Sequence, residues 1–161
     1  MILLPAQRRC AWLSVVFVLL AVGACAEVEY RPYDEKADAK AAIAQLLADT
    51  ASQKRILLTF GANWCEDSRA LESHYRDPEL AALLQREFRV LHVDVGVSHR
   101  NLDINQRYGN PIDKGIPSVV LLRPDGTVLY TAHGKLSSAH RMSHKKVMTF
   151  FTRLAADGHV D

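Results

Sequence analysis

Apolar residues recur along the chain with two different periods, and these periods predict helices that alternate with strands. The expected helices are residues 37–51, 65–75, 79–87, 101–108 and a last one that starts near Ser137 or Ser138 and carries Met142, Val147, Phe150, Phe151 and Leu154. The expected strands, which are rich in β-branched and other apolar residues, are residues 55–60, 88–95, 118–122 and 127–130. The predicted order is therefore helix, strand, two helical segments, strand, helix, two strands and a helix.

Local signals predict how these strands pair. Arg123-Pro124-Asp125-Gly126 has proline and glycine where a turn needs them, so the last two strands should form an antiparallel hairpin. A helical crossover joins the first two strands, which should therefore be parallel. Asp77-Pro78 suits the start of the second helical segment, with Asp77 as the N-cap. We expect an α/β fold with a mixed central sheet, a parallel β-α-β unit plus an antiparallel hairpin, flanked by helices.

The first 24 residues have the form of a signal peptide. Arg8-Arg9 precedes an apolar run over residues 10–24, and a charged stretch begins at Glu27. The run is shorter than the roughly 18 or more apolar residues of a membrane-spanning helix. Val22-Gly23-Ala24-Cys25 resembles the lipobox of bacterial lipoproteins, which would make Cys25 a lipidated first residue. Ala24-Cys25-Ala26 also fits an ordinary cleavage site, and we favour lipidation.

Either form of processing takes the protein out of the cytoplasm. We expect a periplasmic protein attached to a membrane through lipid on Cys25. The residue after Cys25 is Ala26, and not the aspartate that acts as a retention signal. We therefore expect the lipoprotein to be sent to the outer membrane in a Gram-negative cell. Residues 25–36 would form a tether. Residues 37–161 would form one domain, since the ~135 residues beyond the leader suffice for a single core.

Charge and histidine content point to no special partner. The chain has 20 Lys and Arg against 18 Asp and Glu, and without Arg8 and Arg9 the two classes balance, which argues against nucleic-acid binding. His140 and His144 would share a face of the predicted last helix, as a metal pair does. No third ligand stands near them in the sequence. We expect no metal, no cofactor and a monomer.

Cysteine usage isolates one thiol. Of the 3 cysteines, Cys10 lies in the leader and Cys25 at its end, so Cys65 is the one thiol of the predicted domain. Cys65 follows a strand that stops at Gly61, and it precedes a helix. Orphan N–H groups and the helix dipole favour the thiolate there. Glu66 and Asp67 beside Cys65 oppose thiolate formation through their negative charge.

The segment around this thiol resembles the active-site segment of thioredoxin-like proteins. That family has Trp-Cys-x-x-Cys after an apolar strand and a Gly-Ile-Pro loop before a Val-rich strand. This chain has Phe60-Gly61-Ala62-Asn63-Trp64-Cys65-Glu66-Asp67-Ser68, with serine in place of the second cysteine, and later Gly115-Ile116-Pro117-Ser118. The resemblance spans essentially the whole mature chain and implies a thioredoxin-like fold.

The resemblance also implies roles for individual residues. Cys65 would be the nucleophile, flanked by Trp64, and Ile116-Pro117 would be a cis-proline loop that pairs with substrate. Ser68 stands where the family has its resolving cysteine, so it could donate a hydrogen bond towards the sulfur but could not attack a disulfide. Thr59 stands where thioredoxins usually carry a buried aspartate that shuttles protons.

A single thiol can only form a mixed disulfide with another molecule. The sequence thus predicts an exported monothiol protein that engages protein or small-molecule thiols and disulfides at Cys65, in thiol–disulfide exchange and cell redox homeostasis. It leaves open whether the protein is an enzyme, a monothiol thiol–disulfide oxidoreductase. The alternative is a redox-inactive peptide-binding or chaperone-like module that uses the groove of Trp64 and Ile116-Pro117 without covalent chemistry.

Overall fold

The computed structural model describes residues 30–160, and the predicted signal peptide and Cys25 lie outside this range. Within it, no helix is both long enough and apolar enough to cross a membrane. The helices are α1 (Ala39–Ala48), α2 (Glu66–Tyr75), α3 (Pro78–Glu87), α4 (Leu102–Arg107), the 3₁₀ turn η1 (Ala139–Arg141) and α5 (His144–Asp157). The strands are β1 (Arg55–Gly61), β2 (Phe88–Asp94), β3 (Ser118–Leu122) and β4 (Val128–Thr131).

These strands form one mixed sheet in the order β2-β1-β3-β4. β1 and β2 are parallel, and β3 is antiparallel to both β1 and β4. The predicted β-α-β unit and hairpin are therefore confirmed. β1 lies inside the sheet, and its residues from Ile56 to Gly61 are all buried.

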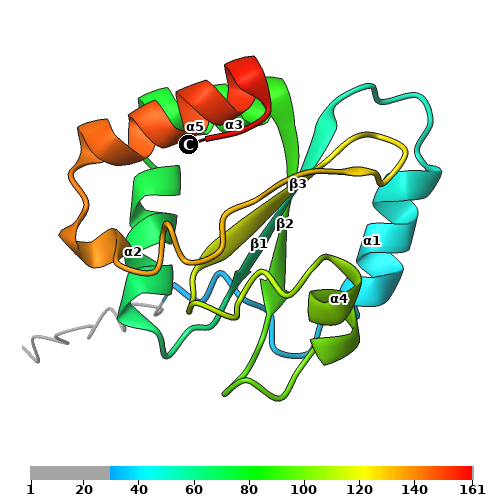
Figure 1. The fold of residues 1–161 in the computed structure, drawn as a ribbon, viewed down its shortest axis with the longest axis horizontal. Helices are drawn as coiled ribbons and strands as arrows, with labels where there is room; N and C mark the ends of the chain where they lie inside the picture. Colours follow the sequence, from blue (N-terminus) through cyan, green and yellow to red (C-terminus); the bar gives the residue numbers. More distant parts are fainter. Residues whose placement is uncertain (1–29, 161) are drawn as a thin grey trace, which may run out of the picture.

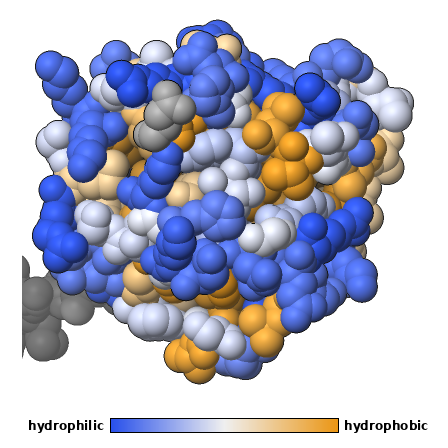
Figure 2. All heavy atoms as spheres, viewed as in Figure 1, coloured by the Kyte–Doolittle hydropathy of each residue, from blue (hydrophilic) through white to orange (hydrophobic). Residues whose placement is uncertain are grey.

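Helices cover both faces of the sheet, α2, α3 and α5 on one and α1 and α4 on the other (Figure 1). Successive β1 side chains point to opposite faces, so Leu57 packs with the core under α2, α3 and α5, while Ile56 and Leu58 pack with the core under α1 and α4. The face drawn in Figure 2 is mostly polar, and its apolar side chains form separate small patches. The end of β1 that leads into α2 is thus held between two apolar layers.

The prediction for the last helix is wrong about where the helix begins. The chain forms η1 first, and Met142 then takes extended backbone angles (φ −82°, ψ 136°) that interrupt the helical path. α5 begins only at His144, where Ser143 caps it by accepting a hydrogen bond from the Lys146 N–H. His140 and His144 therefore lie on separate helical elements, and the expected shared face is absent.

The segment before α1 packs against the domain. The sequence assigns residues 25–36 to a tether, yet Tyr33 is only 1% exposed and exchanges two hydrogen bonds with Asn63. The Tyr33 N–H donates to the Asn63 side-chain oxygen, and the Asn63 amide donates to the Tyr33 carbonyl. This segment is therefore attached directly to the loop that carries Trp64 and Cys65.

Candidate functional site

Cys65 lies where the chain turns from β1 into α2. It is the N-cap residue of α2, with extended backbone angles (φ −81°, ψ 119°), and its N–H donates to the Ala62 carbonyl at 3.1 Å. The thiol is half-buried and unpaired, and its sulfur donates a long hydrogen bond to the Ile116 carbonyl oxygen at 3.7 Å. The fold therefore brings together two segments that are 51 residues apart in the sequence.

The Ile116–Pro117 loop borders the thiol, as the sequence predicts. The peptide bond between these residues is cis, which confirms the predicted geometry. Pro117 is buried, whereas Ile116 is partly exposed. The assignment of Ile116 and Pro117 to substrate binding stays a prediction.

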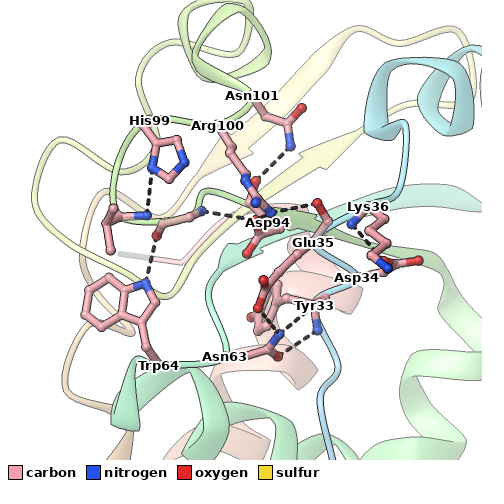
Figure 3. Close-up of polar contacts among 12 residues, drawn as sticks. Tyr33, Asp34, Glu35, Lys36, Asn63, Trp64, Asp94, His99, Arg100 and Asn101 are labelled. Carbon is pink, nitrogen blue, oxygen red and sulfur yellow. Dashed lines mark hydrogen bonds and ion pairs between the residues drawn. The ribbon is translucent and has the colours of Figure 1, made fainter.

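Two exposed apolar side chains belong to the loops before Cys65 and after β2. Trp64 is 58% exposed and donates its indole N–H to the Gly96 carbonyl at 2.8 Å (Figure 3). Val97, the next residue in that loop, is 70% exposed. Sequence reasoning identified Trp64 but not this loop, because the contact depends on where the end of β2 lies in the fold.

Ser68 lies inside the protein. It is fully buried on α2, and the Ala62 N–H donates to its hydroxyl oxygen at 3.4 Å. The Ser68 hydroxyl also lies beside the phenol of Tyr33, since a Cβ placed on Gly61 would be 2.4 Å from the Tyr33 hydroxyl and 2.8 Å from that of Ser68. No hydrogen bond joins Ser68 to the Cys65 sulfur within residues 30–160. The Ser68 hydroxyl therefore stabilises the loop at Ala62 and makes no hydrogen bond with the thiol.

A buried polar cluster beneath the motif was missed by the sequence analysis. Its members are Tyr33, Thr59, Glu72, Tyr75 and His92. Glu72, on α2, is 2% exposed and lies 2.7 Å from His92 Nε2, and the Thr59 hydroxyl lies 3.2 Å from that of Tyr75. Thr59 and His92 are register partners on β1 and β2. Glu72 follows Cys65 by seven residues and Ser68 by four, so the three residues lie on the same side of α2. An acidic residue on the side of a helix that carries its apolar residues is the sequence signal that could have identified Glu72.

Two tyrosines of this cluster are expected to make the protein less stable in alkali. Burial, followed by the charge of Glu72, raises the pKa of Tyr33 and Tyr75 well above 10.0. The unfolded chain releases these protons near about pH 10, so above that pH it binds fewer protons than the folded protein. The free energy of unfolding should then fall by about 1.4 kcal/mol per pH unit for each tyrosine. Denaturant unfolding between about pH 9 and pH 11 measures this slope.

Phenylalanine substitutions separate the contributions to that slope. Tyr33→Phe and Tyr75→Phe should each make the fall with pH shallower. Tyr30→Phe is the matched control, because Tyr30 is 48% exposed and its pKa is raised less strongly. A slope that is the same in all three variants and the native protein would contradict the assignment.

Polar contacts fix the loop around Asn63. Arg100 donates to the Glu35 carbonyl at 2.6 Å and to the Asp94 carboxylate at 3.1 Å (Figure 3). The Asn63 amide donates to the Glu35 carboxylate and is the largest cause that lowers the pKa of that group. The loop before Cys65 is therefore held both by the segment before α1 and by the loop after β2.

The histidines near the site pair with carboxylates. His140 lies 2.6 Å from Asp67, and His144 lies 3.6 Å from Asp77. His133 pairs with Asp113 at 3.3 Å. Within the described part of the chain, no three side chains of histidine, cysteine or acidic type form a group that could hold a metal ion. Asp67, in the first turn of α2, has its charge offset by His140 whenever that imidazole is protonated.

Comparisons with known proteins identify relatives of this architecture. Residues 34–124 match a family model described as thioredoxin-like. A structure of a disulphide isomerase from Xylella fastidiosa Temecula1 is 43% identical, with a TM-score of 0.76 over 79% of this chain and 98% of that one. A search of curated proteins gives no match.

More distant structures were also found. The thioredoxin Deadhead of Drosophila melanogaster is 22% identical, with a TM-score of 0.48 over 71% of this chain and 93% of that one. The C-terminal domain of DsbD from Neisseria meningitidis, in its oxidised form, is 24% identical, with a TM-score of 0.46 over 57% of this chain and 79% of that one.

Proposed function

The chain belongs to the thioredoxin-like family, and we propose that it carries out thiol–disulfide exchange through the single thiol of Cys65. The 3.7 Å contact between the Cys65 sulfur and the Ile116 carbonyl carries the proposal. It places the thiol beside a backbone segment with which an extended substrate chain could pair. The 43% identical protein described as a disulphide isomerase supports thiol–disulfide chemistry in general.

The first step is attack of the Cys65 thiolate on one sulfur of a partner disulfide. A bond forms between Cys65 and that sulfur, and the partner's disulfide bond breaks. The second partner sulfur leaves with the electron pair and takes a proton from water. Ser68 has no sulfur with which to release the mixed disulfide, so a thiol from outside the protein must do so.

The origin of that second thiol decides the net reaction. If a different cysteine of the substrate attacks the substrate sulfur of the mixed disulfide, a new substrate disulfide forms and Cys65 leaves as the thiolate, so the substrate's disulfides are rearranged without net oxidation. If two external thiols take part, they are oxidised to a disulfide while the substrate disulfide is reduced. Isomerisation therefore needs only one protein thiol, which suits Cys65 and Ser68 as they stand.

The leader suggests where this chemistry takes place. We propose export through the signal peptide of residues 1–24 and lipidation of Cys25, which would hold the protein at a periplasmic membrane surface, the outer membrane in a Gram-negative cell. An unlipidated mature chain that begins at Glu27, found by intact mass of the membrane-extracted protein, would refute the lipid anchor.

The exchange proposal predicts one covalent adduct on Cys65. The full chain incubated with excess glutathione disulfide should gain one glutathione at Cys65 faster than the denatured chain does, because the fold presents this thiol at a helix N-terminus, where negative charge on the attacking sulfur is stabilised. Mass spectrometry of the Cys65 peptide measures the rate and excludes Cys10 and Cys25. In Cys65→Ser, no adduct should form in this peptide.

The exposure of Trp64, next to Cys65 in the chain, and of Val97, in the loop that Trp64 contacts, supports the second candidate, a peptide-binding module. Under that hypothesis Cys65 in the folded protein reacts no faster than in the denatured chain, and Cys65→Ser binds partners as well as the native protein does. A general chaperone would need a large exposed apolar surface, whereas the exposed large apolar side chains among the described residues belong to separate segments of the chain: Tyr30, Trp64, Val97, Leu102 and Val128. A defined peptide that contacts Trp64 would fit better.

A further inference from the structure

Glu72 is a buried carboxylate that the exchange steps above do not use. Its side chain is 2% exposed, and its one hydrogen-bond partner within residues 30–160 is His92 Nε2, at 2.7 Å. Burying a carboxylate costs several kcal/mol unless neighbouring groups compensate it. Because Cys65, Ser68 and Glu72 are spaced by three and four residues, they lie along one side of α2. Glu72 therefore lies in the core directly behind the motif.

Tyr33 packs between His92, the partner of Glu72, and Ser68, which follows Cys65 on α2 by three residues. Its ring packs edge-on against His92, with centroids 5.4 Å apart, and its hydroxyl lies beside that of Ser68. That hydroxyl is buried and has no hydrogen bond of ordinary geometry among the described residues. After burial itself, the charges of Glu72, Tyr75 and Cys65 are the causes that raise the Tyr33 pKa, in that order. The Tyr33 phenol thus lies within electrostatic reach of both Glu72 and Cys65.

Other charged and titratable groups also border this cluster. Those that face Glu72 are Tyr30 and Tyr33 from the segment before α1, Tyr75 and Arg76 from α2, His92 from β2, and Lys54 from the loop before β1. Those near Cys65 are Glu66, Asp67 and Arg69 from its own helix, together with His140, which pairs with Asp67 from η1. Glu72 differs from the two other acids of α2 in being fully enclosed.

We propose that Glu72 and Tyr33 are positioning residues that together set the pH range in which Cys65 reacts. The proposal rests on the proposed exchange function of Cys65. The buried negative charge of Glu72 opposes formation of a second negative charge on the sulfur. The Tyr33 hydroxyl contacts the hydroxyl of Ser68, and its dipole can stabilise negative charge nearby, on the carboxylate or on the thiolate. The two residues should therefore act on Cys65 in opposite directions.

The test is the pH profile of Cys65 alkylation by iodoacetamide in the full chain, measured at the Cys65 peptide by mass spectrometry. Glu72→Gln keeps the shape and a hydrogen bond to His92 but removes the charge, so the midpoint of the profile should move down by about 0.5–1 pH unit. Tyr33→Phe keeps the ring packing but removes the donor, so the midpoint should move up. In the double variant the two shifts should not add, because both residues belong to the same buried cluster.

Glu66→Gln is the matched control, since Glu66 is an exposed acid next to Cys65 on the same helix. The shift in midpoint that Glu66→Gln causes should disappear in about 1 M salt, whereas the shift caused by Glu72→Gln should persist, because Glu72 is enclosed. An unmoved midpoint in a Glu72→Gln variant with native circular dichroism would overturn the proposal. If that variant does not fold, Tyr33→Phe decides, and an unmoved midpoint there overturns it equally.

The native profile tests the proposed function separately. A native Cys65 that reacts as slowly as in the denatured chain at every pH refutes exchange chemistry. The roles of Glu72 and Tyr33 are tested only by the difference in midpoint between the native protein and the variants.

Discussion

Replacing Ser68 with cysteine is expected to turn the single-thiol site into one that forms an internal disulfide and releases its own mixed disulfides. Ser68 lies one helical turn after Cys65, where Cβ atoms are about 5–6 Å apart in a regular helix. Cys65 is at the N-cap with non-helical backbone angles, so it has freedom to approach the shorter separation that a disulfide needs. Ser68 is fully buried, and a sulfur there would be shielded from competing thiols.

The rate of release measures this effect. An internal thiol has an effective concentration on the order of 1 mM or more, so with an external thiol near 10 µM release should be about a hundredfold faster than in the native protein. Disulfide reduction of an insulin-type substrate should rise with it. Ala70→Cys is the control, because residue 70 lies about 140° around α2 from Cys65 and cannot close the same ring. A Ser68→Cys protein that keeps two free thiols under oxidising conditions would contradict the expectation.

Short-range patterns predicted most of this fold. The hairpin from Ser118 to Thr131 has its turn chemistry in four consecutive residues, and the Asp77-Pro78 helix start is local in the same way. The strand-to-helix turn at Cys65 also depends on neighbouring residues. Because each signal lies within the element that it determines, the sequence alone was enough for the parallel β1–β2 pair and the β3–β4 hairpin, through the rules for crossovers and hairpins. The antiparallel pairing of β1 with β3, which sets the sheet order, joins distant segments and was not predicted.

The interior of the site depends on contacts between distant segments, and the sequence could not predict these. Tyr33 reaches Asn63 across 30 residues, and Glu72 reaches His92 across 20. In the sequence, residues 25–36 are polar enough for a tether and Glu72 is one acid among many. The break at Met142 was missed because Ser143 is equally compatible with the interior of a surface helix and with its cap.

The buried surroundings of Thr59 restrict which side chains can replace it. Its hydroxyl is fully buried and 3.2 Å from that of Tyr75, and the charge of Glu72 already raises the pKa of Tyr75. An aspartate in place of Thr59 would therefore add a second carboxylate to a cluster that encloses one. We expect Thr59→Asp to destabilise the fold, through like-charge repulsion and desolvation.

Gly61 is required by the close approach of Tyr33. A Cβ on residue 61 would lie 2.4 Å from the Cζ and the hydroxyl oxygen of Tyr33 and 2.8 Å from the Ser68 hydroxyl, far inside normal contact distances of about 3.5–4.0 Å. Tyr33 cannot retreat easily, because two backbone hydrogen bonds to the Asn63 side chain fix it and its ring is enclosed. The absence of a side chain at position 61 thus lets the segment before α1 reach the back of the motif.

Gly61→Ala is therefore expected to lower the free energy of unfolding by about 3 kcal/mol, as overpacking of a rigid core does. Gly109→Ala is the matched control: its φ of +79° strains an alanine backbone, but nothing lies within 4 Å of the added Cβ, so about 1 kcal/mol is expected. Denaturant unfolding of both variants measures the difference. In a Tyr33→Ala background the same Gly61→Ala change should cost less than in the native protein, since the obstructing phenol is gone and only the 2.8 Å approach to the Ser68 hydroxyl remains. If Gly61→Ala proves no more costly than Gly109→Ala, Tyr33 does not pack against β1 as described, and its position between His92 and Ser68 is lost as well.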